Sequence, residues 1–381
     1  MGVQNAYPPR QNTKKRRRRR KKSSRTMLFS LGMLALIGVA LGAYIIIFGQ
    51  RNQTVSMSAT PIVTTATYIN TGRGLLYQSD GQVNYYDLKD SKKNSTFGMG
   101  AADIRMTGSS YLTAVFNSNS LQIYAPNTSP LAFTGTVKEA ECGKNYLAVL
   151  RASDDGKESI LIVTTDGTQV DQLTFDDQYI VDFGFYMLNG AEMLWYQSMN
   201  VNSGVPTTMI SVYSLTKQAT IGVMQIQNQL VDELYITGSS IFVAGTNQII
   251  RYSHDGNKEV YRQMVYGYRV LDFSSAGDAP TFLMAPRGGD FHSVKILTLQ
   301  EGTTNSTAVE TYLQLPTEGV AAFIMGSRLV VVSQESVYIY SLKGKLTATK
   351  TLELPVDDAV KISDSTLMLS SNGIFYLASV S

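Results

Sequence analysis

Apolar residues follow two different patterns along the chain. Between Met27 and Phe48, 22 consecutive residues are uncharged and mostly apolar, with no polar face. As a helix, this run spans about 33 Å at ~1.5 Å per residue, enough to cross a bilayer core of roughly 30 Å. From about residue 55 onward, short runs rich in Val, Ile, Tyr, Phe and Thr alternate with turn residues. The first pattern predicts one transmembrane helix, and the second predicts a domain built from strands.

Cations around the apolar run predict its orientation. Ten Lys or Arg residues lie within 15 residues before Met27, and only Arg51 lies just after the run. By the positive-inside rule, the N-terminus stays cytoplasmic and the strand-rich part is extracytoplasmic. A cleaved signal peptide is the alternative, but its apolar region usually has about 7–15 residues and a small-residue cleavage site. The topology-setting residues are Lys14, Lys15, Arg16, Arg17, Arg18, Arg19, Arg20, Lys21, Lys22 and Arg25.

These features divide the chain into three expected parts. Residues 1–26 form a basic, disordered cytoplasmic tail, residues 27–49 a signal-anchor helix, and residues 50–381 an extracytoplasmic domain in the cell envelope. Gly38 and Gly42 have the spacing that brings two membrane helices close, which would give a dimer. Glycine is common in membrane helices without such pairing, so the dimer remains an alternative.

The charge balance differs sharply between the tail and the rest of the chain. Residues 1–51 hold 12 of the 33 Lys and Arg and none of the 30 Asp and Glu. The remainder therefore has 21 basic and 30 acidic residues, a net charge of −9. An acidic domain repels a phosphate backbone, so we expect no nucleic-acid partner. The single cysteine, Cys142, excludes an intramolecular disulfide.

The strand-rich part repeats. Ile104–Leu112, Leu234–Gly245 and Phe323–Val331 each contain a strand, a Gly- or Ser-containing turn and an apolar strand. A third strand follows, marked near its end by Tyr86, Tyr124, Val163, Tyr213, Tyr252, Leu297, Tyr340 and Tyr376. These markers recur on average every 41 residues, a period that fits a propeller blade of four strands. We predict an all-β propeller of eight blades, or seven if the weak unit 139–178 is miscounted.

The chain ends after only three strands of the last unit, 360–381. The strand predicted at 55–63 precedes the first unit and would supply the fourth strand, which removes an exposed sheet edge. This pattern resembles the eight-bladed propellers of the quinoprotein-like class, including the outer-membrane assembly lipoprotein. The whole layout is similar to membrane-anchored propellers of Gram-positive bacteria. Quinone-dependent dehydrogenases of this class carry a docking Trp in each blade, whereas this chain has only Trp195. The resemblance therefore extends to the fold and not to the chemistry.

No motif predicts catalysis, a metal or a cofactor. His254 lies in a Ser-His-Asp-Gly turn, where three adjacent residues cannot converge as a triad, and neither it nor His292 has zinc-ligand spacing. Acidic pairs occur at Asp154-Asp155, Asp176-Asp177 and Asp357-Asp358, beside turns where Asp bonds to nearby backbone. We expect a protein that is not an enzyme; a hydrolase built from Asp and Glu around the central channel is the third hypothesis.

Two units are longer than the others, and both carry extra residues between their second and third strands. The extra segments are Gln197–Pro206, after Trp195 and Tyr196, and Ala285–His292, which contains Arg287. Trp, Tyr and Arg are enriched in binding hot spots, and insertions in repeat proteins often decorate one binding face. We therefore predict a protein-interaction platform for envelope proteins that uses Trp195, Tyr196, Arg287 and His292. Tolerated surface loops are the alternative for the insertions, and a glycan or small-molecule sensor is the alternative function.

Overall fold

The structure is a computed structural model that describes residues 38–39, 54–98, 103–124, 130–200, 207–275, 279–288, 291–299 and 308–380. Contacts divide the chain into two units, Met1–Gln53 and Thr54–Ser381. In the first unit, Gly38 and Val39 are helical and exposed. The cations of the tail, Gly42 and the rest of the predicted span lie outside the described residues. No helix in the described ranges combines the length and apolar character that crossing a bilayer requires.

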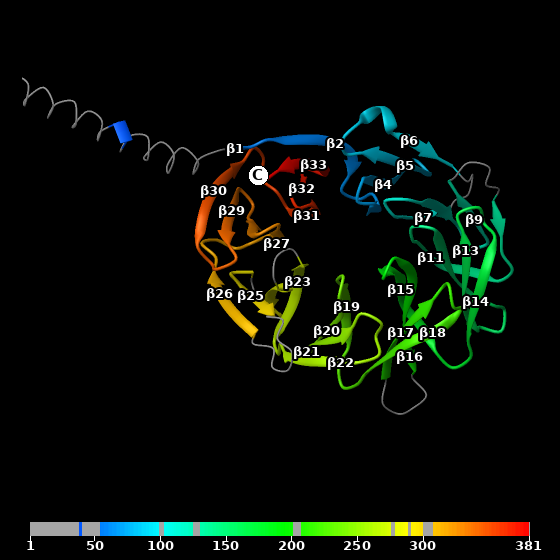
Figure 1. Ribbon diagram of the computed structural model, residues 1–381. Helices are drawn as coiled ribbons and strands as arrows, with labels where there is room; N and C mark the ends of the chain where they lie inside the picture. Colours follow the sequence, from blue (N-terminus) through cyan, green and yellow to red (C-terminus); the bar gives the residue numbers. More distant parts are fainter. Residues whose placement is uncertain are drawn as a thin grey trace, which may run out of the picture. The chain divides into compact units, whose positions relative to one another are not determined.

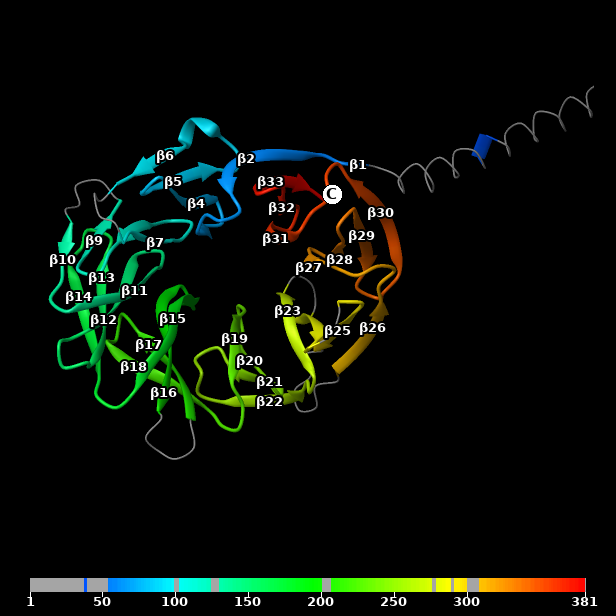
Figure 2. The same cartoon turned by 180° about the vertical axis from the view of Figure 1, so that it is seen from behind.

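The second unit is an all-β propeller with eight blades (Figures 1 and 2). Each blade contains four antiparallel strands, of which the first lies nearest the centre of the ring and the fourth towards its edge, and blade 7 has a fifth strand. Residues 139–178 fall within an ordinary blade and its following link, so the alternative of seven blades is wrong. Seven of the eight predicted markers fall on third strands, and the eighth, Tyr124, directly follows its strand. The predicted fold class and the count of eight are confirmed.

The blades follow one another in chain order. Blade 1 consists of β3 (Tyr68–Asn70), β4 (Gly74–Ser79), β5 (Gln82–Asp87) and β6 (Ser95–Phe97), with the 3₁₀ turn η1 (Ser91–Lys93). Blade 2 consists of β7 (Arg105–Gly108), β8 (Thr113–Phe116), β9 (Ser120–Ile123) and β10 (Leu131–Ala132). Blade 3 consists of β11 (Thr136–Cys142), β12 (Tyr146–Ala152), β13 (Glu158–Thr164) and β14 (Gln169–Phe175). Blade 4 consists of β15 (Tyr179–Leu188), β16 (Ala191–Asn200), β17 (Thr207–Ser214) and β18 (Ala219–Ile226).

The second half of the ring repeats this arrangement. Blade 5 consists of β19 (Val231–Ile236), β20 (Ser240–Gly245), β21 (Gln248–Ser253) and β22 (Glu259–Met264). Blade 6 consists of β23 (Tyr268–Ser274), β24 (Thr281–Pro286), β25 (Ser293–Leu299) and β26 (Ala308–Gln314). Blade 7 consists of β27 (Ala321–Met325), β28 (Arg328–Val332), β29 (Ser336–Ser341) and β30 (Leu346–Leu352). Blade 8 takes β31 (Asp358–Ser363), β32 (Thr366–Ser371) and β33 (Ile374–Ser379) from the end of the chain.

Two N-terminal strands close the ring. β2 (Met57–Val63) pairs antiparallel with β33 as the outer strand of blade 8, where Thr60 Oγ1 donates to Phe375 O at 2.8 Å. β1 (Thr54–Val55) pairs parallel with β30 as a fifth strand of blade 7. The sequence analysis places a closing strand at 55–63, but it does not foresee the two-residue extension of blade 7. Together the two strands cover the outer edges of the last two blades (Figure 1).

The hydrophobic core is divided among the gaps between blades. Eight clusters of buried side chains occur among the described residues, one between each pair of neighbouring blades. Between blades 4 and 5, for example, Ile210 and Val212 pack with Ile241 and Val243. The alternation of side chains along each strand allows one sheet to contribute to two clusters, so every blade depends on both neighbours.

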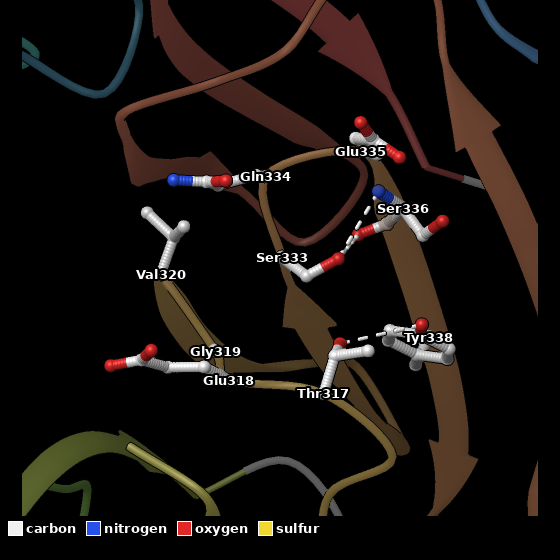
Figure 3. A pocket seen from close by; sticks show the side chains of 9 residues that line it. All are labelled: Thr317, Glu318, Gly319, Val320, Ser333, Gln334, Glu335, Ser336 and Tyr338. Atoms are coloured by element: carbon white, nitrogen blue, oxygen red, sulfur yellow. Dashed lines mark hydrogen bonds between the residues drawn. The ribbon is translucent and has the colours of Figure 1, made fainter. Parts of the chain in front are cut away.

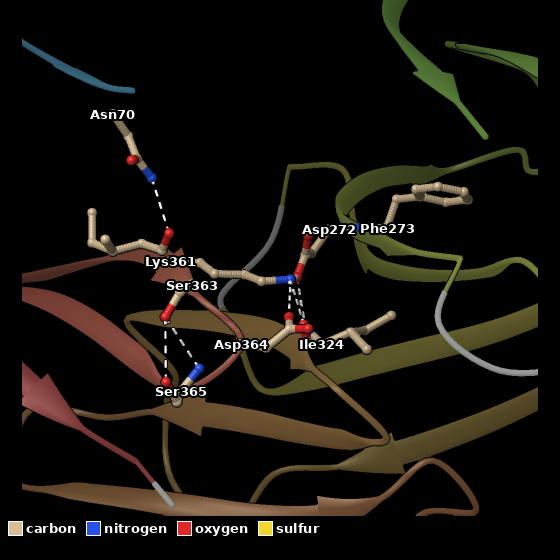
Figure 4. A network of polar contacts seen from close by, with 9 residues as sticks. Asn70, Asp272, Phe273, Ile324, Lys361, Ser363, Asp364 and Ser365 are labelled. Atoms are coloured by element: carbon tan, nitrogen blue, oxygen red, sulfur yellow. Dashed lines mark hydrogen bonds and ion pairs between the residues drawn. The ribbon is translucent and has the colours of Figure 1, made fainter. Parts of the chain in front are cut away.

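A polar network joins the inner strands of the last three blades (Figure 4). Lys361 of β31 lies 3.2 Å from Asp272 Oδ2 of β23, and its Nζ also donates to Ile324 O of β27. The amide of Ile324 donates to the same Asp272 oxygen at 2.8 Å. Asn70 of β3 continues the network by donating to Ile362 O at 3.1 Å. These contacts tie blades 6, 7, 8 and 1 together beside the centre of the ring.

Candidate partner-binding surface

The propeller has two chemically different faces. Because the strands of a blade alternate in direction, the first–second and third–fourth connections emerge on one face, here named the turn face. The second–third connections and the links between blades emerge on the other, here named the link face. Both predicted insertions belong to the link face.

Charge is distributed unequally between these faces. Among the described connecting residues, the link face has ten acidic and two basic side chains, whereas the turn face has nine basic and four acidic ones. The link-face residues are Asp80, Asp103, Asp154, Asp155, Asp176, Asp177, Glu318, Glu335, Glu353 and Asp357, with Lys157 and Arg287. The turn-face residues are Arg73, Lys89, Lys92, Lys93, Lys144, Lys217, Lys258, Lys343 and Lys345, with Asp90, Asp166, Asp255 and Asp364. The acidic surplus of the domain is therefore concentrated on its link face.

Large apolar side chains are exposed on the link face at three successive links. Tyr179 is 58% exposed where β15 begins, Leu230 is 61% exposed between blades 4 and 5, and Tyr266 is 66% exposed between blades 5 and 6. Single exposed apolar residues are normal, but a run of them along one rim is typical of an interaction site. None of the three is predicted from the sequence, because a lone apolar residue in a link gives no periodic signal.

Arg287 positions one of these links. Its amide donates to Gly267 O at 2.7 Å and its Nε to Tyr268 O at 3.0 Å. Its guanidinium also pairs with Asp232 at the start of β19. The side chain predicted from sequence to contact a partner thus holds the link that carries Tyr266 against blade 5.

The connection after Arg287 packs on the next link. Leu315 N donates to His292 O and Gly319 N donates to Phe291 O, both at 2.8 Å. A Cβ on Gly319 would lie 3.1 Å from the Phe291 ring, so only glycine permits this close approach without displacement. The His292 side chain itself is exposed.

A pocket of about 450 Å³ lies beside this link (Figure 3). One wall is the link between blades 6 and 7 and the other is the second–third turn of blade 7. Glu318 and Glu335 are exposed on these two elements, and Thr317 Oγ1 donates to the Tyr338 hydroxyl at 3.4 Å. The described lining residues include no Lys, Arg or His; they are Thr317, Glu318, Gly319, Val320, Ser333, Gln334, Glu335, Ser336 and Tyr338.

Trp195 and Tyr196 lie within the core of the ring. Tyr196 is buried between blades 3 and 4, with its ring 5.3 Å from that of Phe175. Trp195 is partly buried in the cluster between blades 4 and 5. The insertion that follows begins as strand, since β16 continues to Asn200, and only 201–206 lie outside the described residues. The exposed candidate surface is therefore formed by other side chains.

The His, Cys and Asp side chains that could serve in catalysis or metal binding do not lie together in the structure. His254 is on the turn face, with its ring centroid 5.2 Å from that of Tyr186 in a tilted arrangement, whereas His292 is on the link face. Desolvation lowers the pKa of His254, and burial raises the pKa of the Cys142 thiol. Asp155 accepts a hydrogen bond from Ser153 in its own turn, and Asp176 pairs with Lys157 at 2.9 Å. Within the described ranges, no group of three His, Cys, Asp or Glu could hold a metal ion.

The fold defines the class of protein, an eight-bladed β-propeller. No family model matches the chain, and no curated protein matches it. Among solved structures, the WD40 domain of SCAP from fission yeast is similar with a TM-score of 0.56 at 9% identity, over 85% of this chain and 97% of that one. The Dos1 propeller is similar with a TM-score of 0.51 at 9% identity, over 87% and 95%. At these identities the likeness shows the fold alone.

Proposed function

We propose that the protein is a non-enzymatic, single-pass membrane protein of the cell envelope whose propeller captures a partner protein on its link face. The observation that carries this proposal is the row of exposed Tyr179, Leu230 and Tyr266 on successive links. Tyrosine supplies a large contact area with little conformational freedom to lose on binding. The rigid blades beneath hold these links in place before any partner arrives.

The support for the tether comes from the sequence alone. The apolar run 27–48, with cations before it, supports an anchor with a cytoplasmic N-terminus and an extracytoplasmic propeller. Such an anchor raises the effective concentration of the propeller for neighbouring envelope proteins. Pairing of two anchors through Gly38 and Gly42 would present two propellers together.

The test is crosslinking of the full-length protein in intact membranes of the organism that produces it. The double variant Leu230→Ser/Tyr266→Ser removes exposed side chains without touching the core, so folding should be unchanged. We expect the crosslinked partner to decrease by at least about tenfold. Tyr111→Ser is the matched control, since Tyr111 is 62% exposed on the turn face. Equal loss in the control, or unchanged capture by the double variant, would disprove the site.

A small-molecule sensor is the second candidate, supported by a turn-face groove. The groove has a volume of about 730 Å³ between blades 4 and 5 and is lined in part by Lys217, His254 and Asp255. A ligand screen by thermal shift, with Lys217→Met as the comparison, tests this function. A ligand that stabilises the native chain and not the variant would move the proposal to this groove.

A further inference from the structure

We infer that the pocket between blades 6 and 7 receives a cationic side chain, Lys or Arg, of the partner that docks on the link face. This inference rests on the proposed function and names the chemistry of the partner. The pocket lies on the same face as Tyr266. A partner extended along this rim would therefore meet both.

Charge is the first reason for the inference. Glu318 and Glu335 come from opposite walls, as Figure 3 shows, and no described cation lines the pocket. The only basic side chains among the described link-face connections are Lys157, which pairs with Asp176, and Arg287, which pairs with Asp232. An incoming cation would thus meet a field of one sign, and carboxylates form charge-assisted hydrogen bonds with it.

The shape of the pocket is the second reason. Its volume of about 450 Å³ lies in the range of side-chain and small-ligand sites. The aliphatic stem of Lys or Arg can pack on Val320 or the Tyr338 ring, while its charged end approaches the Glu318 or the Glu335 carboxylate. Backbone hydrogen bonds fix the wall: Val320 N donates to Val332 O at 2.7 Å and Val356 N to Gln334 O at 2.8 Å. The site is therefore formed before binding.

Immobilised peptides provide the test. The purified full-length protein is applied to peptides with a Gly/Ser background and one central Arg, Lys, Gln or norleucine. We expect retention on Arg and Lys to exceed that on Gln and norleucine by about tenfold. Glu318→Gln/Glu335→Gln should abolish this preference. Asp177→Asn/Asp357→Asn removes the same charge from exposed link-face positions outside the pocket lining and should preserve it.

Two results would overturn the inference. One is equal retention on charged and neutral peptides; the other is an equal loss of preference in both double variants, which would indicate a general effect of net charge. Melting curves of both variants check that each remains folded. Crosslinking in membranes separates this inference from the proposed function. Capture lost in Leu230→Ser/Tyr266→Ser but intact in Glu318→Gln/Glu335→Gln would reject the pocket and retain the platform.

Discussion

Asp182 in blade 4 and Asp272 in blade 6 occupy equivalent positions with different surroundings. Each directly follows a β-bulge in the inner strand of its blade, at Ile180/Asp182 and Val270/Asp272. Each accepts a hydrogen bond of 2.8 Å from the amide of the following Phe. The local sequence and backbone are thus nearly the same in both blades.

Their neighbours differ. The second oxygen of Asp272 accepts from Ile324 N and pairs with Lys361 (Figure 4). Asp182 instead faces Glu139 and Glu141 of blade 3, and no Lys or Arg forms a described ion pair with any of the three. Desolvation raises the pKa of all three carboxyls, and Glu139 and Asp182 raise that of Glu141 further, to about 7. A bulge sets where a carboxylate stands, but only tertiary packing decides whether its charge is compensated.

The largest expected effect comes from removing the compensating cation. Lys361→Met leaves Asp272 without its partner, and Lys361 is only 22% exposed. We expect the free energy of unfolding to fall by about 3 kcal/mol. Urea titration followed by the fluorescence of Trp195, the single Trp, measures it. Lys343→Met on the turn face should change stability by less than about 0.5 kcal/mol; a similar loss there would refute the role of the network.

Removing Glu141, whose carboxyl pKa is raised the most of the three, should increase stability instead of decreasing it. The pKa of Glu141 is raised from 4.5 to about 7 in the folded state, so its contribution to stability is present below pH 4.5 and lost as the pH rises through 7. Glu141→Gln should flatten this part of the pH profile and gain about 2 kcal/mol relative to the native chain at pH 8. Urea titrations between pH 4 and 8 compare the two. If the free energy of unfolding depended on pH equally in Glu141→Gln and in the native chain, Glu141 would not be the source of that dependence.

A smaller gain should follow from Asp182→Asn. The substitution removes one of the charges that raise the pKa of Glu141 and keeps the size of the side chain. We expect about 1 kcal/mol of added stability at pH 8 and almost none at pH 4. Asp272→Asn serves as the opposite case, because it removes the less exposed of the two carboxylates that pair with Lys361 and should destabilise. If both variants changed stability in the same direction, the claim that Asp272 has a compensating cation and Asp182 has none would be wrong.

Salt should give the smallest effect. Screening weakens repulsion among Glu139, Glu141 and Asp182, so at pH 8 the native chain should gain about 0.5 kcal/mol between low and high salt. Glu141→Gln should gain less. Thermal unfolding at two ionic strengths measures the difference, and equal gains would place the salt effect elsewhere on the molecule.

The ring of blades could be predicted because its repeat is a packing requirement. Residues such as Tyr213, Tyr252 and Tyr340 recur at one position of the third strand, where each fills a gap between neighbouring blades. The same burial misleads about function. Trp195 and Tyr196 precede an insertion in sequence, yet their side chains belong to two core clusters. Adjacent strand residues point to opposite sides of a sheet, and both sides of a blade are covered.

The candidate surface could be predicted only in part. The unequal unit lengths locate both insertions on one face, and the structure agrees with that placement. The exposure of Leu230 and Tyr266, and the pocket lined by Glu318 and Glu335, depend on how separate links meet in space. The spacing of residues along the chain does not predict which links lie next to one another. The internal bonds of Arg287 were likewise invisible, since Asp232 lies 55 residues away.

Ring closure by β2 sets an order of events during synthesis. Apart from the two-residue β1, β2 leaves the ribosome before every other strand of the blades, but its partner β33 begins only at Ile374. At about 5–20 residues per second, this interval lasts roughly 15–60 s. Until then Ile62, fully buried in the finished ring, has no blade 8 to pack against. A ribosome that stops before β33 would release a chain with an open ring and unpaired strand edges, which chaperones and proteases recognise. Chains interrupted before β33 and chains with a closed ring therefore differ in the strand edges that they expose.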